Sequence, residues 1–197
     1  MVNWLNKVLR AGERIKAAIR KRATKEELSK SNYVSCCKGL VSKKEIASNY
    51  HTCPYCSKHF KVTPAERFGY LFDSGIYETF KTPIPADDPL QFVAAKAYID
   101  QLKSARKNTG LDCSMVVASG EINKIKCTAV ASDWSFMGAS IEAAEGESIL
   151  YAAHHAIQNR QPLIIVAQGG GMRMQASMLS LSQMPRATLA INEVKAA

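Results

Sequence analysis

The stretch Leu163-Ile-Ile-Val-Ala-Gln-Gly-Gly-Gly-Met-Arg-Met-Gln175 carries the clearest structural signal in the chain. Its first five residues are apolar and three of them are β-branched, which predicts a short buried strand over 163–167. Three glycines at 169–171 let the backbone turn sharply and let a ligand approach closely. Apolar residues then recur among polar ones, which predicts a helix over 172–181.

A strand, a glycine turn and a helix start together can hold negative charge. The first N–H groups of a helix have no partner inside it, and the helix dipole adds positive charge there. We therefore expect unpaired backbone amides at this turn that bind a phosphate or the oxyanion of an enolate or tetrahedral intermediate. The alternative is a turn that needs glycine only for steric reasons. No Lys-Ser/Thr pair closes the turn, which excludes a Walker-type phosphate loop.

Composition and charge narrow the class of protein. The 197 residues are 47% hydrophobic, which favours one globular core with a small appendage over disorder. No apolar stretch reaches about 18 residues and no secretory signal opens the chain, so we expect a cytoplasmic protein without a membrane span. In that compartment, six cysteines favour metal binding over disulfides.

The N-terminal region, residues 1–32, is basic and has apolar residues at roughly helical spacing from Trp4 to Ile19. We expect an amphipathic helix that docks its apolar stripe on the protein body or on a partner. A patch that contacts RNA or another nucleic acid, a membrane-surface helix and an organelle transit peptide are the alternatives.

Residues 33–60 form a cysteine-rich module that resembles a zinc ribbon. The knuckle Cys53-Pro-Tyr-Cys56 is intact, and Cys37 lies at the right distance before it. The other knuckle is broken, because Val34 occupies the position of its first cysteine and Cys36 stands beside Cys37. We expect a structural Zn²⁺ held by Cys36, Cys37, Cys53 and Cys56, with the fourth ligand open and a histidine, His51 or His59, as its alternative. The opposite possibility is that zinc is lost or weakly held.

The remaining residues, 61–197, predict a layered α/β domain. Residues 64–107 predict two helices around a Pro-rich loop, the second starting at Asp87 or Asp88 and ending near Gly110. Strands over 113–119 and 125–132, a small-residue turn at 136–140 and a helix over 141–158 follow. Two helical segments end the chain. Cys113 and Cys127 are expected in the core, and His154 and His155 on a helix as surface or packing residues.

The order of these features resembles a known family. The basic start, the Cys-Pro-x-Cys knuckle, His59–Arg67, Asp133-Trp-Ser-Phe-Met-Gly-Ala-Ser140 and Gly169-Gly-Gly-Met-Arg-Met-Gln175 together are similar to the β subunit of bacterial and plastid acetyl-CoA carboxylase carboxyltransferase. The resemblance spans roughly residues 3–193. It implies a partial crotonase-like (ClpP/crotonase) β-β-α core, because the family continues well beyond position 197. Departures from the family pattern include Ala139, Glu142 and Ala176.

The resemblance also implies a function: transfer of the carboxyl group from carboxybiotin to acetyl-CoA, giving malonyl-CoA for fatty acid biosynthesis. The backbone of Gly170 and Gly171 would then stabilise the thioester enolate. Phe136, Met137 and Gly138 would form the neighbouring wall of the acyl site. Arg173 would bind a CoA phosphate or orient the turn, and a surface salt bridge is its alternative.

The partners implied by the resemblance are the carboxyltransferase α subunit in an α2β2 assembly and the biotin carboxyl carrier protein. Activity at this chain length stays open. Two other functions fit the residues: a non-catalytic nucleic-acid-binding or regulatory zinc-ribbon protein, and another crotonase-type acyl-CoA carboxylase or decarboxylase subunit. The glycine turn cannot separate the acyl-CoA enzymes, because all of them must stabilise an enolate.

Overall fold

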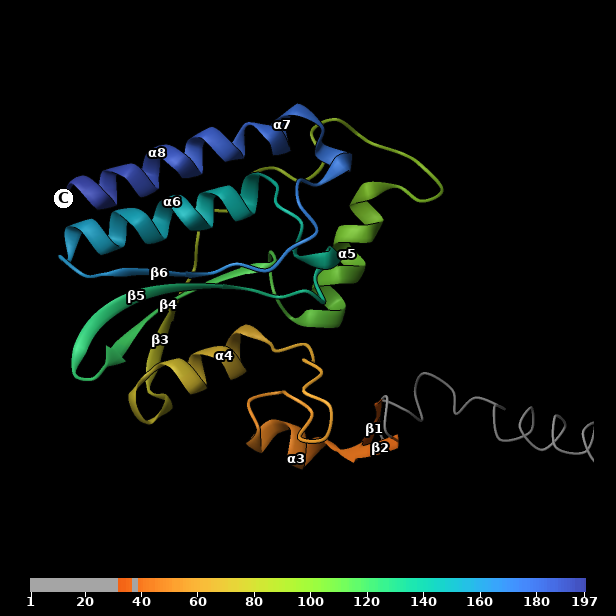
Figure 1. The fold of residues 1–197 in the computed structure, drawn as a ribbon. Coiled ribbons are helices and arrows are strands. Elements are labelled where there is room, and N and C mark those ends of the chain that lie inside the picture. Colours follow the sequence, from red (N-terminus) through yellow and green to blue (C-terminus); the bar gives the residue numbers. More distant parts are fainter. Residues whose placement is uncertain (1–31, 37–38) are drawn as a thin grey trace, which may run out of the picture. The chain divides into compact units, whose positions relative to one another are not determined.

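The computed structural model describes residues 32–36 and 39–197, and the chain divides into two compact units, 1–60 and 61–197 (Figure 1). The N-terminal helix expected over 1–32 therefore lies outside the described residues, except for its last position. In the part of the chain that the structure describes, no helix is long and apolar enough to span a bilayer.

The described part of the first unit is a small hairpin with one helix. Strands β1 (Tyr33–Cys36) and β2 (Gly39–Ser42) pair antiparallel, and helix α3 (Lys43–Ser48) follows at once. The Ser42 side chain accepts a hydrogen bond from the Lys44 amide and so caps the helix. The buried core of this described part consists of Val41, Ile46 and Cys53. A core this small gives little stability without a cross-link.

The second unit is built on a four-stranded sheet in the order β3-β4-β5-β6. Strands β3 (Tyr77–Phe80), β4 (Met115–Ile122) and β5 (Ile125–Ser132) form an antiparallel meander. Strand β6 (Leu163–Val166) runs parallel to β5 and forms the other edge. A parallel pair needs a crossover, and helix α6 (Ala143–Gln158) supplies it. This β-β-α-β order agrees with the α/β core expected from the sequence.

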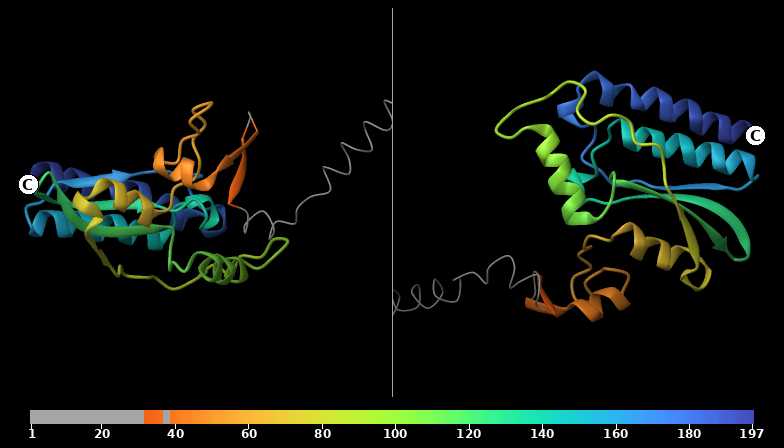
Figure 2. Two further views of the ribbon diagram at one scale, coloured as in Figure 1. Left: turned by 90° about the horizontal axis from the view of Figure 1, so that it is seen from below. Right: turned by 180° about the vertical axis from the view of Figure 1, so that it is seen from behind.

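Helices cover both faces of the sheet (Figure 1). On one face α6 packs with the terminal helix α8 (Gln183–Ala196), and on the other lies α4 (Pro64–Leu71). The strands alternate accordingly: Val117 and Val130 face α6, whereas their neighbours Ala118 and Ala129 face the aromatic residues of α4. Figure 2 shows the same layers from below and from behind.

Helix α5 (Tyr98–Thr109) begins later than the sequence predicts. A start at Asp87 or Asp88 is wrong, because Asp88 has φ +44° and its carboxylate accepts a hydrogen bond from the Phe92 amide in a non-helical loop. The predicted end near Gly110 is confirmed, since Gly110 is the left-handed C-cap with φ +71°.

Two further details of the sheet differ from prediction. Strand β3 was not expected, because its four residues lie in a region predicted to be helix and loop. Strand β4 begins at Met115 and continues to Ile122, so it lies two to three residues later than the strand predicted over 113–119. The hairpin turn is made by Asn123 and Lys124, both with positive φ, the conformation that favours a tight two-residue hairpin.

Candidate active site

The glycine turn follows β6, as predicted, but no helix starts directly after it. The helix expected over 172–181 is wrong: a single 3-10 turn, η3 (Met174–Ala176), comes first, and α7 (Met178–Leu181) begins only after Ser177 at φ +49°. Met172 instead forms an isolated parallel β-bridge with Ile141. The turn therefore cannot draw on a helix dipole in the way the sequence suggests.

The glycine turn lies against the turn formed by residues 136–140. The Gly170 amide donates to the Gly138 carbonyl at 2.8 Å, and the Ile141 amide donates to the Gly171 carbonyl at 2.8 Å. A Cβ built on Gly169 would come within 2.6 Å of the Ala139 carbonyl oxygen. Glycine at 169 is thus required by the close approach of these two backbones.

The two glycine amides differ in availability. The expectation that both are unpaired is wrong for Gly170, whose N–H already has the Gly138 carbonyl as acceptor. Gly171, at φ +87°, is exposed, and its N–H has no acceptor among residues 32–36 and 39–197. Of these two glycines, Gly171 offers its amide to an oxyanion in this conformation, whereas Gly170 would first have to break its hydrogen bond to Gly138.

The expected wall of the acyl site is only partly accessible. Phe136 is fully buried and packs against Tyr98 and Leu102, so its side chain does not face a ligand. Met137 and Gly138 are half-buried, and a Cβ on Gly138 would meet open space. Met137, Gly138 and Ala139 all have positive φ (50°, 67° and 51°), which is strained for the two residues that carry a side chain.

Arg173 lies in the core, not on the surface, with 2% of its area exposed. Its guanidinium makes five hydrogen bonds: Nε to Ser140 Oγ (3.1 Å), one terminal nitrogen to Tyr98 Oη (3.0 Å) and Glu142 Oε2 (3.1 Å), and the other to the Ser140 carbonyl (2.6 Å) and Glu145 Oε1 (2.7 Å). These use all five N–H donors of an arginine. A buried guanidinium with these partners fits neither the CoA-phosphate role nor the surface salt bridge.

Helix α6 supplies both carboxylates from its first turn. Glu142 is the N-cap and Glu145 the third residue, and the two form a capping box. Glu145 is fully buried and also accepts from the amide and hydroxyl of Ser114. The positive end of the helix dipole and Arg173 together compensate the two acids.

This environment shifts several pKa values. Burial raises the pKa of Glu142 more than the Tyr98 hydroxyl and Arg173 lower it. Burial likewise raises the pKa of Tyr98. Burial alone would lower the pKa of Arg173, but the nearby Glu145 and Tyr98 raise it overall. The guanidinium is thus held charged inside the protein.

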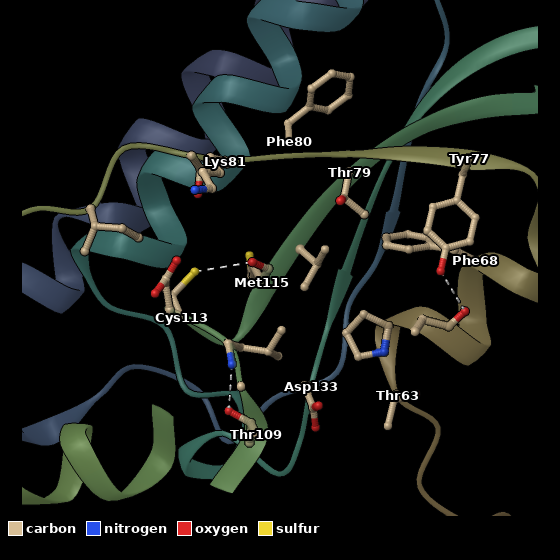
Figure 3. Close-up of a pocket in the computed structure, with 18 residues that line it drawn as sticks. Thr63, Phe68, Tyr77, Thr79, Phe80, Lys81, Thr109, Cys113, Met115 and Asp133 are labelled. Atoms are coloured by element: carbon tan, nitrogen blue, oxygen red, sulfur yellow. Dashed lines mark hydrogen bonds between the residues drawn. The ribbon is translucent and has the colours of Figure 1, made fainter. Parts of the chain in front are cut away.

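A separate cavity of about 490 Å³ opens beside β3 and β4 (Figure 3). Its lining combines apolar side chains with a few polar ones, and Figure 3 labels these among them: Phe68, Tyr77, Thr79, Lys81, Met115 and Asp133. Segments far apart in the sequence line this cavity, so no local sequence motif predicts it. The glycine turn does not line it.

The two histidines of the second unit lie toward the C-terminal end of helix α6. His154 is exposed on α6. His155 bonds Thr128 at 2.9 Å and packs against Phe80, near the opposite end of that helix from Glu142. The expectation that both are surface or packing residues is confirmed. Cys113 and Cys127 are core residues, as predicted.

The first unit brings three cysteines together as a candidate metal centre. The Sγ atom of Cys36 lies 3.3 Å from that of Cys53 and 3.1 Å from that of Cys56. Tetrahedral coordination with Zn–S bonds of about 2.3 Å would place the sulfurs about 3.8 Å apart, a small expansion. The three thiols can therefore bind a metal ion. Cys37, the other predicted ligand, lies outside the described residues, and His59 Nδ1 is hydrogen-bonded to Thr52.

Fold and site together define an α/β protein with an exposed amide at a glycine turn and, in its first unit, a cluster of three thiols. Residues 88–196, more than half of the chain, match the carboxyl transferase domain. The chain belongs to this carboxyl transferase family.

Two relatives carry the same description, acetyl-coenzyme A carboxylase carboxyl transferase subunit beta. The one from Pelagibacter ubique is 53% identical over 194 residues, which is 98% of this chain and 63% of the relative. The one from Dinoroseobacter shibae is 37% identical over 198 residues, covering 100% of this chain and 60% of the relative. The chain thus spans less than two thirds of the length of these relatives.

Solved structures show a more distant likeness. Transcarboxylase 12S, crystallised with methylmalonyl-coenzyme A and methylmalonic acid, has 20% sequence identity and a TM-score of 0.49, covering 66% of this chain and 23% of that chain.

Proposed function

We propose that this chain acts as a β-type subunit of acetyl-CoA carboxylase carboxyltransferase, which moves the carboxyl group of carboxybiotin to acetyl-CoA and yields malonyl-CoA. The observation that carries the proposal is the 53% identity to a named β subunit over 98% of the chain. The glycine turn supports it independently, since it presents the Gly171 amide to solvent without an acceptor in the described residues.

The chemistry needs a stabilised enolate. The methyl group next to the thioester carbonyl loses a proton, which by atom balance ends on the biotin nitrogen that gives up its carboxyl group, and negative charge develops on the carbonyl oxygen. The Gly171 N–H donates to that oxygen, and a donor fixed about 3 Å away lowers the barrier by a few kcal/mol. Met137 and Gly138 border the reacting carbon, where the open space over Gly138 admits the acyl group. Gly170 becomes a second donor if its bond to Gly138 opens on binding.

The proposed assembly contains the carboxyltransferase α subunit, in an α2β2 arrangement, and the biotin carboxyl carrier protein, and its compartment is the cytoplasm. The proposed metal is a structural Zn²⁺ bound by Cys36, Cys53 and Cys56, with the fourth ligand open between Cys37 and a histidine. Thiolate ligands dominate, so the ion would stabilise the fold of the small unit and leave no site for an activated water.

The test is reconstitution of the full chain with the α subunit and carboxylated biotin carrier. Malonyl-CoA formation from acetyl-CoA is the expected result, measured against propionyl-CoA and against a mixture without the chain. A complex that assembles but forms no malonyl-CoA would contradict the proposal. Preferred turnover of propionyl-CoA would point to another acyl-CoA carboxylase.

A further inference from the structure

We propose that Arg173 is a positioning residue whose buried network with Tyr98, Ser140, Glu142 and Glu145 holds the Gly171 amide in the direction needed for an oxyanion. The inference rests on the proposed function for its chemical purpose. Its structural content, the control of one backbone amide by one buried side chain, can be measured without any enzyme assay.

The backbone of Arg173 is connected to Gly171 through Ile141. The Arg173 amide donates to the Ile141 carbonyl at 2.9 Å, and the Ile141 amide donates to the Gly171 carbonyl at 2.8 Å. Hydrogen bonds therefore fix the backbone on both sides of the Gly171 amide: the Gly170 amide bonds to the Gly138 carbonyl before it, and the Gly171 carbonyl and Arg173 amide bond to Ile141 after it. The orientation of the Gly171 N–H follows from both.

The side chain of Arg173 bonds to residues at the start of both α5 and α6. The Arg173 guanidinium reaches the first residue of α5 (Tyr98), both acids of the first turn of α6 and both oxygens of Ser140. A guanidinium is planar with its donors in a fixed fork, so five bonds determine its position and its rotation. Ser140 also ends the 136–140 turn and donates to the Met137 carbonyl, so both turns share this anchor.

Desolvation opposes the burial of this charged cluster. Burying three charged groups costs several kcal/mol per ion by desolvation, and well-packed apolar residues often stabilise a core as well or better. Net stability is thus a weak reason for this cluster. Fixing the geometry of the glycine turn is a stronger reason. The adjacent turn, residues 137–139, has positive φ at every residue, and such a strained conformation persists only where the surrounding structure holds it.

Two variants weaken the network without stranding a buried charge. Ser140→Ala removes the Nε acceptor, and Tyr98→Phe removes a hydroxyl that accepts from Arg173 and donates to Glu142 at 3.0 Å. The matched control is Ser182→Ala, which deletes an exposed hydroxyl bonded to the Leu179 carbonyl.

The readout is amide hydrogen exchange by NMR at the three amides that fix the turn: Gly170, Arg173 and Ile141. We expect exchange about tenfold faster in both variants, as loss of one hydrogen bond to a charged group predicts, and unchanged in Ser182→Ala. In the reconstituted assay, kcat should fall while KM for acetyl-CoA stays constant, because only the amide direction has changed.

Unchanged exchange at these amides in both variants, or the same acceleration in Ser182→Ala, would overturn the inference. The inference would also be overturned if the decrease in kcat of each variant were fully explained by a smaller fraction of folded protein. Faster exchange together with wild-type protein that forms no malonyl-CoA would sink the proposed function and leave the positioning of Gly171 supported. Arg173→Lys keeps the charge and loses the fork, so it should reproduce the faster exchange.

Discussion

At the scale of single residues, Gly171 and Gly110 make a matched pair. Both have positive φ, and a Cβ on either meets nothing within 4 Å. Alanine at either position should lower the free energy of unfolding by about 1 kcal/mol through backbone strain alone. Only Gly171→Ala should also reduce malonyl-CoA formation, by at least about tenfold, because it tilts the amide.

That comparison is made by urea unfolding and steady-state kinetics of both variants. Equal turnover in Gly171→Ala and Gly110→Ala would remove the Gly171 amide from the mechanism.

Gly169 and Gly170 test the close approach of the two turns. A Cβ on Gly169 would lie 2.6 Å from a backbone oxygen, whereas one on Gly170 would lie 3.4 Å from the nearest atom. Gly169→Ala should therefore cost about 2 kcal/mol or more, since the clashing atom belongs to the main chain and cannot rotate away. Gly170→Ala should cost clearly less. Thermal unfolding of both variants decides this, and equal melting temperatures would mean that the turns separate easily.

At the scale of elements, the N-terminus of α6 should make stability depend on pH. Because burial raises the pKa of Glu142, the folded state keeps a proton there that the unfolded state has already lost. The free energy of unfolding should thus decrease as pH rises from the ordinary value of the carboxyl through the raised one. The pKa of Glu142 also depends on the neighbouring groups Tyr98, Arg173, Glu145 and Asp87.

Glu142→Gln removes the titration and should flatten that part of the curve. Urea unfolding at a series of pH values from 4 to 8 measures this pH dependence of the free energy of unfolding. Glu147→Gln on the same helix is the control, because Glu147 is partly exposed and pairs with Arg186 at 2.6 Å. A slope that survives unchanged in Glu142→Gln would assign the pH dependence to another group.

The elements also differ in how far the sequence reveals them. Strands β4 to β6 were predictable because their β-branched and small apolar residues fit a covered sheet. Strand β3 was not, since Tyr77–Phe80 forms a strand only through pairing with Val117–Gly120, far along the chain. Likewise, the acceptor of the Gly170 amide lies 32 positions earlier, at Gly138, and no local pattern encodes it.

Arg173 illustrates the same limit at the site. The sequence marked it as a candidate but gave no sign that it is buried, because its acids stand at 142 and 145 and Tyr98 lies 75 positions away. A capping-box pattern of two glutamates three residues apart is visible in the sequence and was the one available signal. It indicates a helix start, not a partner for an arginine.

At the scale of the whole molecule, the thiolate cluster and the glycine turn belong to different compact units. The described core of the small unit is slight, so metal binding should supply much of its folding free energy. We expect about one zinc per chain by elemental analysis. Cys56→Ser should lose it, whereas Cys127→Ser, a buried thiol in the other unit, should retain it.

Chelation extends this prediction. Removing the metal should accelerate hydrogen exchange in residues 39–60 and leave the amides of β4 and β5 protected, because all three described thiol ligands lie before residue 61. A preparation without zinc that still protects residues 39–60 would show that the hairpin and α3 suffice. Loss of protection in β4 and β5 together with the small unit would show that the two units depend on each other for folding.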